Sequence, residues 1–156
     1  MNSETDNTPR YPIGTAAAML GVSVQTLRLY ETEGLMIIHK TAGRQRLYSN
    51  TDIRRIECIR HAINEEKISI GGIKRMQAMV PCWDIIKCTA EERNACSAFT
   101  KSSGGCWTYE HTHSHCAEQD CRLCDVYLRS GDCNTIRDMI VSSTLPKQTE
   151  LNEKPL

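Results

Sequence analysis

The cysteines of this chain are distributed very unevenly, and this constrains its fold more than any other feature. Cys58 stands apart in the first half, whereas the other eight lie between residues 82 and 133. The first ten residues are polar, unlike a signal peptide, and no run approaches the ~18 apolar residues of a membrane span. We therefore expect a cytoplasmic protein with no membrane partner, in which clustered cysteines indicate a metal or iron–sulfur site rather than disulfides.

Charge divides the 156-residue chain in the same place. Residues 1–80 carry 11 basic and 8 acidic side chains, and residues 81–156 carry 8 and 11, so the halves have charges of +3 and −3. This length favours one domain, or one small domain with a substantial appendage, and excludes a large multidomain enzyme. We predict a disordered lead-in over 1–10, a first domain over 11–81, a cysteine-rich module over 82–141 and a disordered tail over 142–156.

The first domain has the residue spacing of two short helices joined by a turn. Apolar residues recur at helical intervals from Ile13 to Leu20, and Gly21 ends that run. Ser23 can cap a second helix that continues to about Glu33. Two short helices joined by a glycine-containing turn form a helix-turn-helix.

A small hairpin and two more helices are expected after this unit. Residues 36–39 and 46–48 can pair across a turn as a wing. Ser49 begins an S-x-x-D capping pattern for a third helix, and Ser69 caps a fourth that ends before Pro81. The sequence therefore predicts a mainly α fold, with a winged helix-turn-helix followed by a small irregular cysteine-rich module in which metal coordination replaces part of a core.

Polar and basic side chains gather where such a domain would meet duplex DNA. A recognition helix enters the major groove, and cations around it neutralise phosphates. We expect Gln25 to read a base edge and Arg44 and Arg46 to share one face of the wing. Tyr48, between a strand and a capped helix, fits a core position better than a contact. The predicted DNA-contacting residues are Ser23, Gln25, Thr26, Arg28, Arg44 and Arg46.

These segments resemble the DNA-binding domain of MerR-family transcriptional regulators. The likeness spans about seventy residues and rests on T-L-R-x-Y-E-x-x-G-L from Thr26 to Leu35 and R-L-Y-S from Arg46 to Ser49. The stretch ISIGGIKRM, residues 68–76, is similar to the heat-shock-repressor and glutamine-regulator branch. The resemblance implies a homodimer on a pseudo-palindromic promoter site, control through DNA distortion, and RNA polymerase as a partner at the promoter.

Residue by residue, the resemblance adds Tyr30 to the DNA-contacting set. It implies that Thr26, Arg28 and Tyr30 contact the DNA backbone and that Arg46 is the wing arginine. The chain departs from the family after the fourth helix, where Pro81 and the following Cys-Trp pair replace the start of a long dimerisation helix. The means of dimerisation is therefore open.

The second half has the donor atoms of a metal centre. Its C-x4-C-x2-C spacing, from Cys116 to Cys124, is found in iron–sulfur proteins, but closely spaced thiolates also bind zinc, so the expected cofactor is zinc or an iron–sulfur cluster. The layout resembles cysteine-rich modules with paired Cys-Trp dipeptides in bacterial sensor and regulatory proteins. The candidate ligands are Cys82, Cys88, Cys96, Cys106, Cys116, Cys121, Cys124 and Cys133, with His111, His113 and His115 as further candidates. Cys58 fits a small buried core side chain, and Trp83 and Trp107 fit packing anchors.

Three classes of function remain at this point. We favour a MerR-type regulator whose cysteine-rich half senses a metal or redox signal or stabilises the dimer. A simpler version of this hypothesis is that zinc only stabilises the fold of the cysteine-rich half, which then senses nothing. The alternatives are a small metal-dependent enzyme and an adaptor that binds protein through the winged helix. The sequence has neither H-E-x-x-H nor the H-x-E and P-C-x-x-C pair of zinc deaminases, so we expect no enzyme.

Overall fold

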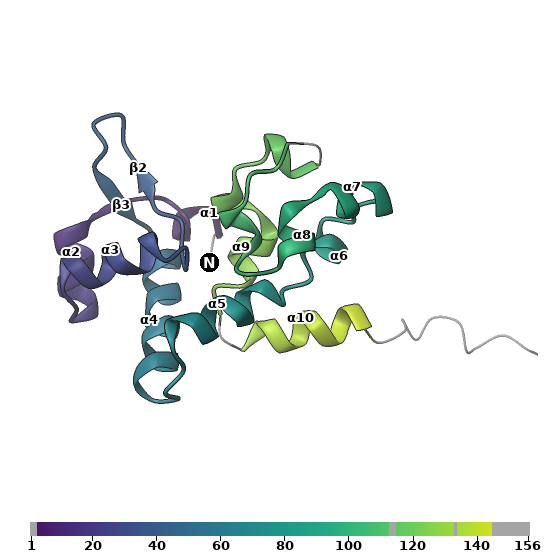
Figure 1. The fold of residues 1–156 in the computed structure, drawn as a ribbon. Coiled ribbons are helices and arrows are strands. Elements are labelled where there is room, and N and C mark those ends of the chain that lie inside the picture. Colours follow the sequence, from purple (N-terminus) through teal and green to yellow (C-terminus); the bar gives the residue numbers. More distant parts are fainter. Residues whose placement is uncertain (1–2, 113–114, 133, 145–156) are drawn as a thin grey trace, which may run out of the picture.

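The helix-turn-helix lies where the apolar spacing predicts it. The computed structural model describes residues 3–112, 115–132 and 134–144 (Figure 1). Helices α2 (Ile13–Leu20) and α3 (Val24–Thr32) are joined by Gly21, which ends α2 in the left-handed conformation at φ 63°. The Ser23 hydroxyl accepts a hydrogen bond from the Thr26 amide and so caps α3.

The wing is a three-stranded antiparallel sheet. Strands β2 (His39–Lys40) and β3 (Arg46–Tyr48) form the expected hairpin, and β1 (Tyr11–Pro12) pairs with the other edge of β3. The sequence prediction missed β1 because a two-residue strand has no periodicity. The added strand ties the start of the domain to the base of the wing.

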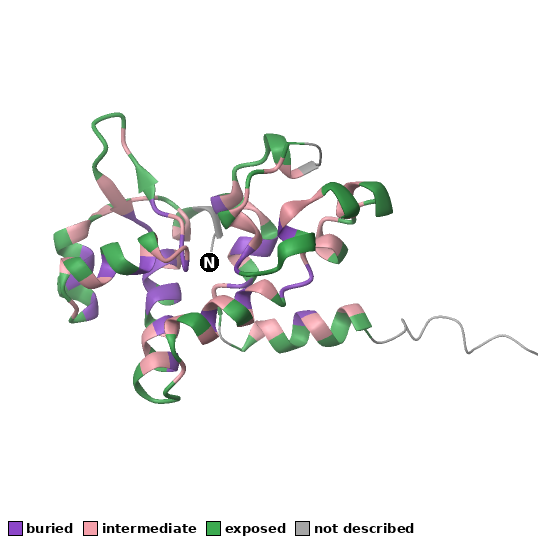
Figure 2. Ribbon diagram, viewed as in Figure 1, coloured by how far each residue is buried: buried purple, intermediate pink, exposed green. Residues whose placement is uncertain are grey.

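Helices α4 (Asn50–Asn64) and α5 (Ile70–Ala78) complete this half around one apolar core (Figure 2). Ser49 and Asp52 form the predicted capping box, and the Ser69 hydroxyl caps α5. Tyr48 is fully buried in the core, as expected. The spacing, caps and core therefore agree over this part of the chain.

The cysteine-rich half consists of short elements around a much smaller apolar cluster, formed by Val80, Val126 and Met139 with half-buried neighbours. Its irregular character confirms the prediction. No helix in the described residues is both long and apolar enough to cross a membrane. The elements are α6 (Cys82–Ile85), α7 (Ala90–Ala95), α8 (Ser97–Lys101), η1 (Cys106–Thr108), η2 (His115–Glu118), η3 (Cys121–Leu123), α9 (Asp125–Arg129) and α10 (Thr135–Thr144).

Both predicted disordered ends need correction. Helix α1 (Ser3–Asp6) packs onto α4 through an ion pair of 3.2 Å between Asp6 and Arg54, so polar contacts order a segment that has no apolar pattern. At the other end, α10 continues to Thr144 and so includes the first three residues of the predicted tail. The predicted disorder of residues 1–2 and 145–156 falls outside the described residues.

Cys58 also differs from the expectation. It is half-buried rather than a core side chain, and it takes part in a disulfide.

Candidate DNA-binding surface and cysteine pocket

The N-terminal half of α3 presents a polar surface. Ser23, Gln25 and Arg28 are exposed, and Thr26 is half-buried. The Ser23 and Thr26 hydroxyl oxygens lie 2.9 Å apart, so the two side chains are fixed beside the first turn of the helix. Amide groups at a helix N-terminus favour a negative group such as a phosphate. This surface can therefore approach the DNA backbone while Gln25 reaches towards the bases.

Tyr30 differs from the other predicted contacts because it belongs to the core. Only 5% of its surface is exposed. Burial raises the pKa of Tyr30, and the nearby Arg60 opposes this effect. Tyr30 therefore positions α3 against the domain, and little of its side chain is left to contact a phosphate.

The two wing arginines do not share a strand face, which corrects the prediction. Arg44 lies in the turn before β3 with φ 63° and is exposed, whereas Arg46 lies in β3. Glu31 of α3 binds Arg46 at 2.5 Å and Lys40 of β2 at 2.7 Å. Glu31 was not among the predicted residues, and it joins the recognition helix to the wing and neutralises part of the wing's charge.

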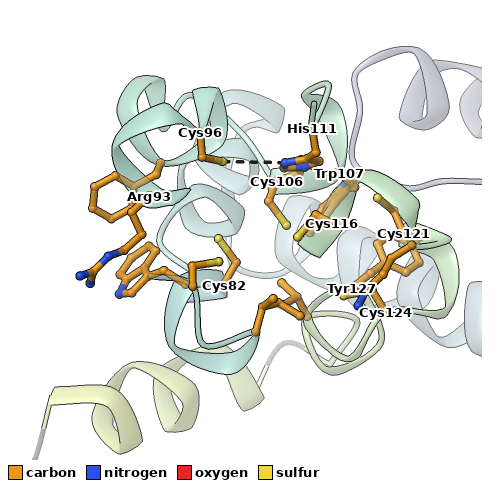
Figure 3. A pocket seen from close by; sticks show the side chains of 16 residues that line it. Cys82, Arg93, Cys96, Cys106, Trp107, His111, Cys116, Cys121, Cys124 and Tyr127 are labelled. Atoms are coloured by element: carbon orange, nitrogen blue, oxygen red, sulfur yellow. Dashed lines mark hydrogen bonds between the residues drawn. The ribbon is translucent and has the colours of Figure 1, made fainter. Parts of the chain in front are cut away.

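The seven cysteines of the second half that the structure describes line one pocket, together with His111 (Figure 3). These seven are Cys82, Cys88, Cys96, Cys106, Cys116, Cys121 and Cys124. Trp83, Phe99, Trp107 and Tyr127 also face the pocket, and Trp83 packs edge-on against Phe99 with ring centroids 5.2 Å apart. Residues from several short elements between 82 and 127 therefore bring their thiol groups together in an apolar setting, which the C-x4-C-x2-C motif alone does not reveal.

The chemistry of these donors fits a soft metal. Thiolates and imidazole nitrogen are ligands of zinc, and thiolates hold iron–sulfur clusters. Among the described residues, no three such groups lie at the distances of a single bound ion. The predicted ligands Cys133 and His113 and the side chain of His115 fall outside the described part of the structure.

Hydrogen bonds already differentiate the thiols. Cys96 Sγ lies 3.8 Å from His111 Nδ1 (Figure 3), and His111 Nε2 lies 2.9 Å from the Cys106 carbonyl oxygen. The hydrogen bond between Cys82 and Cys106 lowers the pKa of Cys82, and together with burial it raises the pKa of Cys106. Cys82 is therefore the member of this pair that becomes the thiolate first.

Comparison with known proteins identifies the first half. Residues 11–79 match the family described as MerR HTH family regulatory protein. They form a MerR-family helix-turn-helix domain. A protein of Streptomyces coelicolor (strain ATCC BAA-471 / A3(2) / M145), described as heat shock protein HspR, is 42% identical over 72 residues. This match covers 46% of the present chain and 48% of that protein, so the chain spans about half the length of this curated relative. The predicted likeness to the heat-shock-repressor branch is confirmed.

Two aromatic residues of the pocket bind the MerR domain directly. The Tyr127 hydroxyl accepts a hydrogen bond from the Ile37 amide at 2.8 Å and donates one to the Ile37 carbonyl at 3.2 Å. Trp107 Nε1 donates to the Gly34 carbonyl at 2.9 Å. Gly34 and Ile37 belong to the segment that joins α3 to β2. The cysteine pocket therefore contacts the connection between the recognition helix and the wing.

Arg55 of the MerR domain is buried against the same two rings. Its Cζ lies 3.8 Å from the Tyr127 ring centroid and 5.2 Å from that of Trp107, and Nη2 donates to the Tyr127 carbonyl and to Ser130 Oγ. Within the described residues no carboxylate lies within salt-bridge distance of this guanidinium. Burial lowers the pKa of Arg55, and the rings, the carbonyl and the hydroxyl stabilise its charge instead.

Sequence reasoning missed Arg55, Tyr127 and Glu31 as site residues. Arg55 follows Arg54 on a helix and has the pattern of a solvent-exposed charge. Trp107 was expected only to anchor packing, although its position next to Cys106 was a usable signal. A residue next to a cysteine in the chain has to move when that cysteine moves. The neighbours of clustered cysteines are therefore the first candidates for residues that connect the pocket to the MerR domain.

Proposed function

We propose that this chain is a sequence-specific DNA-binding transcriptional regulator whose cysteine-rich half senses a metal or redox signal. The observation that carries the DNA-binding part is the exposed, capped N-terminal half of α3 beside a cationic wing, within a MerR domain. A recognition helix and flanking phosphate contacts are what duplex reading requires.

In this proposal each residue of the surface has a defined task. Gln25 reads a base edge, whereas Arg28 and Arg44 contact phosphates on either side of it. Arg46 also adds positive charge to the wing, but its ion pair with Glu31 neutralises part of that charge. A homodimer places two such surfaces on a pseudo-palindromic promoter in the cytoplasm, where RNA polymerase is the further partner.

The cysteine pocket is the proposed sensor site and would hold zinc or an iron–sulfur cluster. The support is the convergence of seven cysteine thiols on one apolar pocket. In such a setting several thiolates would repel one another strongly, and a bound metal compensates their charge. Loss or oxidation of this centre would change the shape and charge of the pocket.

Selection from randomised duplexes followed by fluorescence anisotropy tests the DNA-binding part. Arg28→Ala should weaken binding to selected and scrambled duplexes alike and reduce the salt slope by about one. Arg137→Ala provides the matched control, because Arg137 is an exposed arginine of α10, far from the wing (Figure 1). Equal effects of the two substitutions would contradict the proposed docking. Failure to select any sequence would favour the adaptor.

Anaerobic purification with metal and sulfide analysis tests the cofactor. A broad visible absorption band with acid-labile sulfide identifies a cluster, and a colourless protein containing zinc identifies a zinc site. Protein that contains neither, and that takes up neither zinc nor iron with sulfide, would contradict the sensor site.

A further inference from the structure

We infer that Trp107 and Tyr127 transmit the state of the cysteine pocket to the wing of the MerR domain, an inference that rests on the proposed metal site. Each ring has two sets of contacts. Both rings line the pocket among the thiols (Figure 3), and both use their polar atom to bind the segment between α3 and β2. A shift of either ring therefore acts on both places.

The connecting segment is held tightly. Besides the bonds from Tyr127 and Trp107, Gln77 Nε2 of α5 donates to the Leu35 carbonyl at 3.1 Å. The side chain of Thr108 in η1 also approaches closely, because a Cβ atom on Gly34 would lie 2.8 Å from its Cγ2. With the ends of residues 34–37 fixed in this way, displacement of the rings must change the angle between α3 and the wing.

Candidate ligands are joined to the rings by very short stretches of chain. Cys106 directly precedes Trp107 in η1, and Cys124 immediately precedes α9, the helix that contains Tyr127. The Cys124 carbonyl also accepts the Leu128 amide in the first turn of α9. A metal that draws Cys106 and Cys124 together therefore has to move the two rings, because no flexible linker lies between ligand and ring.

The contacts of Arg55 favour a few distinct positions of the Trp107 and Tyr127 rings over a continuous range of positions. The rings pack edge-on with centroids 5.1 Å apart, and the buried guanidinium lies against both of them. Two of its nitrogen atoms, Nε and Nη1, have no hydrogen-bond partner in the described residues. Partial separation from the rings would expose a buried charge to an apolar space, which is costly, so intermediate positions are disfavoured.

The decisive variant is Tyr127→Phe, which removes the hydroxyl and both bonds to Ile37 but retains the ring beside Arg55 and the pocket. The matched control is Tyr109→Phe, because the Tyr109 hydroxyl binds Ser103 within the cysteine-rich half. Trp107→Phe removes the bond to the Gly34 carbonyl and provides a second variant should the first not fold. Each full-length protein is measured in two conditions, with a chelator and with added Zn²⁺ alone. The measurements are zinc uptake by titration, hydrogen exchange over residues 34–40 and the dissociation constant for DNA.

In the parent and in Tyr109→Phe, we expect zinc to change both hydrogen exchange over 34–40 and the dissociation constant for DNA. In Tyr127→Phe, zinc uptake should persist, while the exchange response disappears and the ratio of the two dissociation constants falls towards 1. If Tyr127→Phe and Trp107→Phe both respond to zinc as the parent does, in hydrogen exchange and in DNA affinity, the inference is wrong but the proposed metal site still stands. A parent that takes up zinc without any change over 34–40 would lead to the same conclusion. A parent that takes up no zinc is tested again with iron and sulfide, and a parent that takes up neither would overturn the proposed metal site, and the inference with it.

Discussion

The carboxylate of Glu31 restrains two cations of the wing, so Glu31→Gln should weaken the fold and strengthen attraction to DNA. Glu31 of α3 binds Lys40 at 2.7 Å and Arg46 at 2.5 Å. The isosteric amide retains the shape of the side chain but not its charge. The substitution therefore tests whether the recognition helix sets the charge available on the wing.

The two pairs are partly open to solvent, which limits their contribution to stability. The side chains of Lys40 and Arg46 are 44% and 29% exposed, against 17% for Glu31. Exposed pairs contribute ~0.2–1 kcal/mol each. Glu31→Gln should therefore cost about 1 kcal/mol of unfolding free energy, or ~2–4 °C in Tm for a chain of this size. The released cations should steepen the salt dependence of DNA binding by up to ~0.9 for each phosphate they neutralise.

This contribution should depend on pH in a defined direction. Burial alone raises the pKa of Glu31, but hydrogen bonds and charge from Lys40 and Arg46 outweigh it and lower the pKa below its ordinary 4.5. The folded state therefore binds fewer protons than the unfolded state, and the stabilisation is fully present above pH 4.5. It is lost as the pH falls through the folded pKa, so the parent and Glu31→Gln should converge in acid.

Thermal unfolding and anisotropy titrations over a range of salt concentrations measure both effects. Glu33→Gln is the matched control, because it changes the charge by the same amount at the end of α3 while its partner is Lys74 of α5, 3.3 Å away. The control should lose a little stability and retain the parental salt slope. Identical salt slopes for the two variants would refute the role of Glu31 on the wing. If Glu31→Gln and the parent are equally stable, the ion pairs of Glu31 with Lys40 and Arg46 do not contribute the expected free energy of unfolding.

Three further changes test the second half and its contact with the first. Ser130→Ala removes one hydrogen bond from the buried Arg55 and should cost ~1.5–3 kcal/mol in chemical denaturation, whereas Ser142→Ala on α10 should cost under about 0.5. Cys121→Ser should uncouple reporter transcription from metal or oxidant while DNA footprints persist, or, if the site is only structural, reduce occupancy under every condition. Truncation after Val80 should leave a folded domain with weak, largely non-specific DNA affinity in gel-shift assays, and tight operator binding by such a monomer would contradict the expected two-fold arrangement.

The elements of the MerR domain could be predicted because several local signals agree there. Apolar spacing, the caps at Ser23, Ser49 and Ser69, and the left-handed Gly21 all point to the same helix boundaries. Helix α1 is different because contacts with α4 order it, including the Asp6 bonds to Arg54 and Asn50. No local pattern encodes such contacts.

The site was predictable in its chemistry but not in its connections. The cysteine spacing predicted a cluster of thiols, and the structure brings the seven described ones to one pocket. The burial of Arg55 could not be inferred, because it depends on rings 52 and 72 positions further along the chain. The different placement of Arg44 and Arg46 could not be inferred either, because the boundary between turn and strand decides it and alternation applies only within a strand.

The boundary between the two halves contains several buried charged groups beside the Trp107 and Tyr127 rings, and this affects how it can respond. Arg122 of η3, next to Cys121, lies 3.6 Å from the Asp52 carboxylate that caps α4, and its Nη2 also donates to the Asn7 carbonyl at 2.7 Å. Arg122 and Asp52 are both buried, as is Arg55. An apolar boundary of similar size would be at least as stable, because buried charges lose their hydration. Buried charges, however, penalise small displacements that apolar packing tolerates. Such a boundary would therefore transmit a displacement of the chain around Cys121 to the start of α4, next to the wing.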